Sequence, residues 1–442
     1  MTGKSGVGSQ VAAIARVSSG NFVEMYDFMV YGYYAKYIGD AFFPTHSAYA
    51  SLMLSLATFG SGYLMRPLGA ILLGSFVDRH GRRIGLLVTL GLMAFGTLTI
   101  ALTPGYAQIG VAAPLIVLIG RLVQGLSAGV ELGGVSIYLA EIAPPGKRGL
   151  YCCWQSASQQ VAVMVAALIG VALSLFMPPA AVGAWGWRLP LVLGCLIIPL
   201  IFYFRSSLTE TEAFQRQARY APRELLVKLA ASWQAVLAGM ILTVLTTTAF
   251  YLITAYTPTY GREVLKLSPT ESMLTTLAVG VSNFFWLPIG GILSDRFGRK
   301  PLLLAVPIVT ILTVYPVMSW LVASPSFGKL VATEIWTSTL FGLYNGAMIP
   351  RLAEIVPARL RTTAFALAYS LANAVFGGFT PAIATYLIHT TGNRAAPAVW
   401  LTFAAAISLI GVLWSNRMGE DNAGSYEITA PEHEPSAEPQ PG

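Results

Sequence analysis

Five ionisable residues lie within long apolar stretches of the sequence: Glu24, Asp27, Arg66, Arg121 and Glu131. Placing such a group inside a membrane helix costs about 2.5–3.5 kcal/mol, so each is a candidate functional residue. Arginine binds a carboxylate through two parallel hydrogen bonds. A carboxylate that meets an arginine in only one state changes its proton affinity between states. The chemistry open to this set is therefore anion binding coupled to proton transfer.

The spacing of these residues predicts two polar stripes on otherwise apolar helices. Intervals of three to four residues separate Asn21, Glu24, Asp27, Tyr31 and Tyr34, and likewise Arg121, Gln124, Ser127 and Glu131. Residues at this spacing share one face of an α-helix. We expect both stripes to face a central cavity, across which Asp27 could pair with Arg121. The alternative for each acid is a fixed structural ion pair.

Further polar side chains in apolar stretches suit either an oxygen-rich ligand or hydrogen bonds between helices. They are Gln155, Gln159, Tyr251, Asn345, Tyr369 and Asn373. Both uses stay open for each of them at this point. We count them as substrate-binding candidates.

The composition places these residues in a membrane. Of the 442 residues, 55% are hydrophobic and only 11% are charged. A soluble domain carries about 25% charged residues, which excludes a soluble enzyme. Crossing a bilayer takes about 20 apolar residues. Twelve segments are long enough: 17–43, 50–77, 84–104, 114–140, 150–176, 187–206, 233–258, 270–294, 301–323, 328–353, 362–389 and 397–416. We therefore expect an all-α integral membrane protein with twelve transmembrane helices.

The distribution of basic residues predicts the orientation. Nineteen of the 27 Lys and Arg residues fall on the side of the N-terminus and six on the other side. Because cytoplasmic loops are the basic ones, we expect both termini in the cytoplasm. We also expect the protein to lie in the inner membrane of a bacterium. The longest polar connection predicts two six-helix bundles, 1–206 and 233–416, joined by a cytoplasmic linker, 207–232. The acidic, proline-containing tail, 417–442, is expected to be disordered.

The two predicted bundles repeat two motifs. Gly-Ser-Phe-Val-Asp-Arg-His-Gly-Arg-Arg over residues 74–83 recurs as Gly-Ile-Leu-Ser-Asp-Arg-Phe-Gly-Arg-Lys over 291–300. A shorter Glu-Pro-Arg pattern follows the fourth and the tenth span. Such repeats indicate a duplicated unit. Their carboxylates can accept hydrogen bonds from arginines or helix N-termini and so hold the halves together. The gating candidates are Asp78, Arg82, Glu141, Arg148, Asp295, Arg299, Glu354 and Arg361. The alternative is that the arginines only anchor helices.

The paired loop motifs resemble the major facilitator superfamily over about residues 1–416. That resemblance implies two six-helix bundles that open alternately to either side of the membrane. The stretch 20–28, the sequence Arg66-Pro-Leu-Gly and the pattern from Arg121 to Glu131 resemble its metabolite:proton symporter branch. Stretches such as 154–160, 256–261 and 376–381 are most similar to the citrate and tricarballylate carriers of that branch. One departure is Met25, where many members have Trp.

The resemblance implies import of a tricarboxylate, citrate or tricarballylate, by proton symport. Expected partners are the carboxylate, protons and the lipid bilayer, for a monomer that uses no cofactor and binds no nucleic acid. The remaining substrate-binding candidates are Arg66, Arg121, Asn21, Tyr26 and Gln124, and the proton-coupling candidates are Glu24, Asp27 and Glu131.

Alternative functions remain open. The substrate could be 2-oxoglutarate, shikimate, proline or betaine, and the coupling ion could be sodium. A sensor that binds a metabolite without transporting it would need an output domain, and 417–442 is too short for one. An enzyme is disfavoured because none of the four histidines lies deep in a predicted span.

Overall fold

The computed structural model describes residues 21–80, 82–129, 131–206, 222–357 and 360–422, and the regular elements among them are all helical. In the first half, helical residues 21–33 precede α2 (Ala35–Phe42), α3 (Ala48–Leu64), α4 (Arg66–His80), α5 (Arg82–Leu102), α6 (Tyr106–Ile109), α7 (Ala112–Ala128), α8 (Glu131–Ile142), α9 (Arg148–Phe176), α10 (Pro179–Ala184), η1 (Gly186–Arg188) and α11 (Leu189–Ser206). The predicted all-α fold is confirmed.

The second half begins with α13 (Pro222–Ala231), which lies in the predicted linker. It continues with α14 (Trp233–Tyr251), η2 (Leu252–Tyr256), α15 (Thr257–Thr259), η3 (Tyr260–Val264), α16 (Pro269–Phe297), α17 (Arg299–Ala323), α18 (Phe327–Ile355), α19 (Arg361–Ala372), η5 (Asn373–Gly377), α20 (Thr380–Thr391) and α21 (Pro397–Asn422). The last helix thus extends past residue 416, where the sequence predicts a tail, because no proline interrupts the chain between Pro397 and Pro431. Residues 207–221 and 423–442 lie outside the described part.

One predicted span is broken beside a functional candidate. The second span consists of α3 and α4, which meet at Met65, directly before Arg66. Pro67 has no N–H to donate to the carbonyl of Tyr63, so the helix cannot continue regularly through this point. The N–H of Met65 turns back to the carbonyls of Gly62 and Tyr63 instead. A new helix, α4, therefore begins at Arg66.

Two spans of the second half contain wide π-helical turns. The first span contains η2, between α14 and Pro258, and η3, after α15, and the second contains η5, between α19 and α20. Proline removes a backbone hydrogen bond, and a π-turn accommodates the extra residue. Such interruptions in transporter helices commonly lie where substrate binds.

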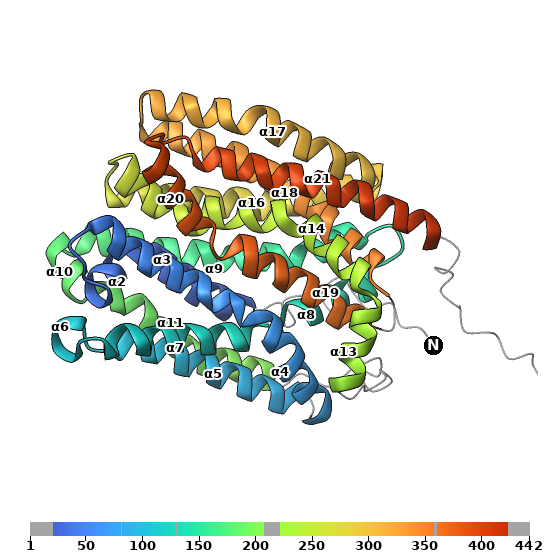
Figure 1. The fold of residues 1–442 in the computed structure, drawn as a ribbon, viewed down its shortest axis with the longest axis horizontal. Helices are drawn as coiled ribbons and strands as arrows, with labels where there is room; N and C mark the ends of the chain where they lie inside the picture. Colours follow the sequence, from blue (N-terminus) through green and yellow to red (C-terminus); the bar gives the residue numbers. More distant parts are fainter. Residues whose placement is uncertain (1–20, 81, 130, 207–221, 358–359, 423–442) are drawn as a thin grey trace, which may run out of the picture.

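The helices form two bundles that meet along one long joint (Figure 1). α3, α4, α5, α7 and α11 pack together, as do α14, α16, α17, α18 and α21. α9 lies against α16, and α19 and α20 lie against α4 and α3. We call the end that holds α13 the α13 end, and the end that holds α6 and α10 the α10 end.

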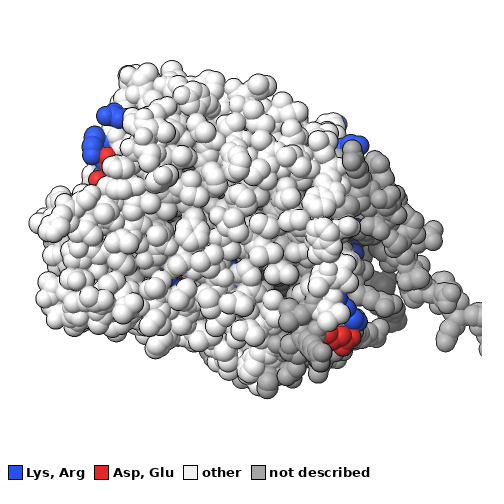
Figure 2. Space-filling view, in the orientation of Figure 1, with Lys and Arg blue, Asp and Glu red and all other residues white. Residues whose placement is uncertain are grey.

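The surface differs from that of a soluble protein, because large apolar side chains are exposed along the helices. Figure 2 shows charged side chains gathered at the two ends of the molecule and a broad uncharged band between them. Phe95, Leu196 and Leu312, in the middle parts of α5, α11 and α17, are more than half exposed. Seven of the described helical segments are long and apolar enough to cross a membrane. The full count of twelve spans stays a prediction, since several of the other helices are shorter or carry charges.

Candidate functional site

Two arginines lie at the centre of the first bundle, cut off from water. Arg66 begins α4 and Arg121 lies within α7, and their exposed fractions are 1% and 0%. Both guanidinium groups stack over the ring of Phe28, at 4.7 and 4.3 Å from its centroid. Cation–π contacts are strongest when both groups are desolvated. Phe28 therefore fixes the spacing of the two positive charges.

Arg66 forms the buried ion pair of the site. Its Nη2 lies 2.7 Å from Oε1 of Glu24, on helical residues 21–33. Nε of Arg66 is buried and has no hydrogen-bond partner. Tyr63 adds a second aromatic face, 4.4 Å from the guanidinium carbon. Because a buried ion pair is costly to break, displacing Glu24 requires a replacement anion or a proton.

Arg121 is connected to Asp27 through two neutral side chains. Its Nη1 donates to Oε1 of Gln124 (2.8 Å), and Nε2 of Gln124 donates to Oγ1 of Thr97 (2.8 Å). Thr97 then donates to Oδ2 of Asp27 (2.5 Å), whose Oδ1 has no partner. The sequence predicts a direct Asp27–Arg121 pair, and this is wrong for the observed conformation. Gln124 shares a helix face with Arg121 and intercepts its guanidinium.

The second bundle covers the arginines with aromatic and amide groups. The ring of Tyr251 lies 5.0 Å from that of Tyr63, and both Tyr251 and Tyr369 lie within electrostatic range of Arg66. Asn373 is the first residue of η5. Its side-chain oxygen lies so close to Gly377 that a Cβ added to this glycine would be 2.9 Å away from it. Asn345 of α18 is fully buried, and neither atom of its amide has a hydrogen-bond partner. Unpaired buried amides are costly unless a ligand or water satisfies them.

The remaining candidates on the first bundle divide into two groups. Asn21, Gln155 and Gln159 are buried, with both amide atoms of Asn21 and Nε2 of Gln155 unpartnered. Tyr26 is instead turned away from the arginines, and its hydroxyl donates to the carbonyl of Pro190 at 2.8 Å. Residues two apart on a helix point about 200° apart, so Tyr26 cannot share the face of Glu24. The structure does not support the prediction of Tyr26 as a ligand.

At the α13 end, Asp295 joins the two bundles. Its two carboxylate oxygens accept hydrogen bonds from the backbone N–H groups of Gly149 (2.8 Å) and Leu150 (2.9 Å), at the start of α9. Arg299 donates to the same carboxylate at 2.8 Å and lies 3.5 Å from Glu354. A helix N-terminus favours a carboxylate through its free N–H groups and its dipole. In this contact, a carboxylate of the repeated motif accepts hydrogen bonds from a helix N-terminus and an arginine, as the sequence predicts.

The other gating candidates are less informative. Glu141 and Arg148 are exposed near the same end, and Arg361 begins α19 with an unpartnered Nε. The side chains of Asp78, Arg82 and Glu131 lie outside the described part of the structure, so their roles stay predictions.

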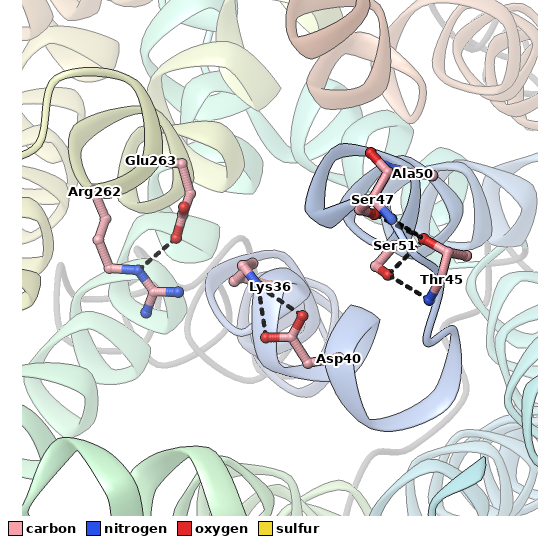
Figure 3. Close-up of polar contacts among 8 residues, drawn as sticks. All are labelled: Lys36, Asp40, Thr45, Ser47, Ala50, Ser51, Arg262 and Glu263. Carbon is pink, nitrogen blue, oxygen red and sulfur yellow. Dashed lines mark hydrogen bonds and ion pairs between the residues drawn. The ribbon is translucent and has the colours of Figure 1, made fainter. Parts of the chain in front are cut away.

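The α10 end is closed as well. The rings of Tyr49 in α3 and His389 in α20 stack at 3.7 Å, and Ser174 and Thr270 join α9 to α16 at 2.9 Å. The guanidinium of Arg262 lies 4.6 Å from the ring of Tyr37. Figure 3 shows this end, with ion pairs Lys36–Asp40 and Arg262–Glu263. The structure is therefore an occluded one, with contacts between the bundles on both sides of the buried arginines.

Sequence reasoning missed three residues of this region. Phe28 and Thr97 are ordinary membrane residues by type, and only the fold brings them to the charges. Glu334 of α18 is a buried carboxyl with 5% exposure. It lies within a predicted apolar span, so the rule that selected Glu24 and Asp27 could have found it.

These findings agree with the comparisons with known proteins. A family model described as Major Facilitator Superfamily matches residues 17–371. The chain belongs to this superfamily. Its fold is similar to that of a D-xylose–proton symporter (TM-score 0.72, 17% identity, 92% of this chain and 97% of that one). It is also similar to a partially occluded, inward-open xylose transporter from E. coli (TM-score 0.72, 16% identity, 91% and 96% covered). At such identities the likeness shows the facilitator fold alone.

Curated relatives of this facilitator superfamily member are much closer in sequence. It is 54% identical to a citrate–proton symporter of Klebsiella pneumoniae, over 93% of each chain. It is 56% identical to a citrate–proton symporter of Salmonella typhi, over 90% of this chain and 92% of the relative. An α-ketoglutarate permease of Escherichia coli is 33% identical, over 93% and 95%. The chain is therefore a multi-pass transporter of the bacterial inner membrane, and the resemblance to the symporter branch is confirmed.

Proposed function

We propose that this protein imports citrate together with protons by alternating access. The observation that carries the proposal is the pair of desolvated guanidiniums, Arg66 and Arg121, held on one aromatic ring at the centre of an occluded transporter. Two arginines neutralise two carboxylates, and the third carboxylate then needs neutral donors or a proton. The 54–56% identical citrate–proton symporters support citrate as the acid.

Substrate and proton binding are coupled through Glu24. A citrate carboxylate that reaches Arg66 competes with Glu24, which now occupies Nη2 of that guanidinium. Once displaced, Glu24 would be a buried carboxylate without a cation, which is strongly unfavourable. It therefore takes up a proton. Asp27 is the second coupling site, because its Oδ1 has no partner in the closed state.

The second bundle completes the binding site. The unpartnered amide of Asn345 and the side chains of Tyr251, Tyr369 and Asn373 provide hydrogen bonds to citrate oxygens. These residues reach the substrate only when the two bundles meet. Closure around citrate thus replaces water by fixed polar groups.

The two closed ends act as alternating gates. With the predicted orientation, the α13 end faces the cytoplasm, and its contact is that of Asp295 with the start of α9. The α10 end faces outward, and its contact includes the Tyr49–His389 stack. Uptake requires that these contacts separate one at a time.

Uptake into proteoliposomes tests the proposed substrate. Purified protein is reconstituted and supplied with labelled citrate, tricarballylate, 2-oxoglutarate, shikimate or proline, with and without an imposed pH gradient. We expect uphill accumulation of citrate only when the outside is more acidic, and no stimulation by a sodium gradient. Preference for proline, or a requirement for sodium, would contradict the proposal.

A further inference from the structure

The second bundle contains a buried carboxyl group that the proposed mechanism does not use. Glu334 is the eighth residue of α18, so it lies about 10 Å inside the α10 end of that helix. Its exposed fraction is 5%, and Oε1 lies 3.0 Å from Oγ1 of Thr257. No lysine or arginine among the described residues forms an ion pair with it. A carboxylate in such a place is unstable unless it is neutralised.

Among the residues that the structure describes, no cation forms an ion pair with Glu334. Tyr260 of η3 lies within electrostatic range of both Glu334 and Arg394, and its hydroxyl donates to the backbone carbonyl of Arg394 at 2.8 Å. The hydroxyl of Tyr256 in η2 lies 3.1 Å from Oγ1 of Thr385. The charged residues of η3, Arg262 and Glu263, pair with each other. The carboxyl therefore faces neutral partners only.

The hydroxyl of Thr257 indicates where the proton lies. Its Oγ1 has one hydrogen and lies 2.7 Å from the carbonyl of Ile253 and 3.0 Å from Glu334. The hydrogen goes to the nearer carbonyl, in the usual bond of a helical threonine to the residue four positions earlier. The bond from Thr257 to Glu334 is then at best a shared and weak one, and Oγ1 is free to accept from a protonated Glu334 instead.

At Asp27, the two distances from the hydroxyl of Thr97 have the opposite order: the carboxylate is nearer than the backbone carbonyl. Oγ1 of Thr97 lies 2.5 Å from the carboxylate and 2.9 Å from the carbonyl of Met93, so its hydrogen goes to the carboxylate. Charge-assisted O–H···O⁻ bonds have such short lengths. The two threonine–carboxyl pairs therefore differ in geometry: the short contact at Asp27 is typical of an accepting carboxylate, whereas the longer contact at Glu334 is compatible with a donating acid.

A cavity at the α10 end lies close to this pair along the chain. Thr257 directly precedes Pro258 and Thr259, which line a cavity of about 120 Å³ at the α10 end, together with Tyr37 and Arg262. Figure 3 shows Arg262 at this end, across from the α2 residue Lys36. Separation of the contacts at the α10 end would open this cavity to water from that side. π-helical turns such as η2 commonly mark functional positions in helices.

We propose that Glu334 is a further proton-binding site of the transporter. Its carboxylate takes a proton from the outer side before the α10 end closes, and the resulting O–H donates to Thr257. The proton is released as the carboxylate forms again later in the cycle, so it is one of the cotransported protons. This inference rests on the proposed function for the transport step, but the bound proton itself can be observed without transport.

Infrared spectroscopy tests the bound proton on purified protein at neutral pH. We expect the carbonyl stretch of a protonated carboxylic acid in the wild type and its loss in Glu334→Gln, with no loss in the matched variant Glu263→Gln. Thr257→Val should shift that band, because the acceptor of the O–H is removed. This second variant keeps the test usable if Glu334→Gln fails to fold. A spectrum that neither substitution alters would overturn the proposal.

Transport stoichiometry tests the role of that proton. In Glu334→Gln, citrate counterflow should stay within about twofold of the wild type, since glutamine resembles the protonated acid. The number of protons taken up per citrate should fall by about one. An unchanged stoichiometry would overturn the transport role even if the infrared band is lost. If the wild type moves no citrate, the proposed function fails, while the infrared result still decides whether Glu334 holds a proton.

Discussion

Single residues carry the chemistry of this transporter, and each buried charge has a different partner. Glu24 pairs directly with Arg66, whereas Asp27 reaches Arg121 only through Thr97 and Gln124. In the proposed mechanism, the direct pair couples binding of an anion to protonation of the displaced acid. The indirect chain lets Asp27 respond to Arg121 without blocking it, so this guanidinium keeps an unpartnered Nε for substrate.

Arg66→Lys tests the guanidinium rather than the charge. Lysine keeps the positive charge but loses the planar, bidentate geometry. Loss of one charge-assisted hydrogen bond costs about 1.5–3 kcal/mol, so the KM for citrate should rise about 10–100-fold. The control is Arg394→Lys, at an exposed position of the α10 end. Equal KM values for the two variants, measured in proteoliposomes, would contradict the role of Arg66.

Asp27→Asn tests proton coupling in the first bundle. Asparagine can still accept the hydrogen bond of Thr97, but it cannot take up a proton. We expect citrate exchange to continue and accumulation driven by a pH gradient to disappear. Asp40→Asn, at an exposed carboxylate of α2, should accumulate citrate normally. Wild-type accumulation by Asp27→Asn would remove this residue from the coupling mechanism.

At the scale of elements, the joint between α9 and α16 depends on small residues. The backbones of Gly149 and Gly291 pack so closely that a Cβ on either would overlap the carbonyl of the other. A Cβ at Gly149 would also lie 2.9 Å from Oδ1 of Asp295. Small residues allow such backbone approach between membrane helices. The Asp295 contact can therefore form only while these two glycines meet.

Gly149→Ala should weaken closure of the α13 end. Cys152 and Cys153 lie one turn further along α9 and are fully buried, so they report opening of this end. In a Cys195→Ser background, we expect their labelling by a maleimide to be about tenfold faster than in the parent, for a shift of about 1.4 kcal/mol. Gly328→Ala is the matched control, because its Cβ would meet nothing within 4 Å. Equal labelling rates in both variants would contradict the gating account.

At the scale of the whole molecule, much of the architecture could be predicted from the sequence. Apolar segments of about 20 residues must cross a bilayer, and the repeated loop motif indicates two related bundles. The positions of Arg66, Arg121, Glu24 and Asp27 could also be predicted, because a charge inside an apolar helix has to face the interior. For that reason the fold and the charged centre agree with the prediction.

The partners of those charges could not be predicted, because helical spacing gives the direction of a side chain but not the helix opposite. Gln124 intercepts Arg121, and Thr97 from α5 reaches Asp27, through contacts that only tertiary packing creates. Tyr26 follows Glu24 by two positions in the sequence, yet its hydroxyl donates to the carbonyl of Pro190, away from the arginines. Closure of both ends depends likewise on pairs such as Tyr49 and His389, which lie 340 positions apart in the chain.

Simultaneous recording of citrate and proton fluxes tests the central claim most directly. Proteoliposomes with the wild-type protein are given external citrate in a weakly buffered medium, and labelled uptake is measured together with external pH. We predict that the medium becomes more alkaline as citrate enters, and that a protonophore abolishes accumulation but not exchange. Citrate entry without any change in external pH would contradict proton-coupled transport.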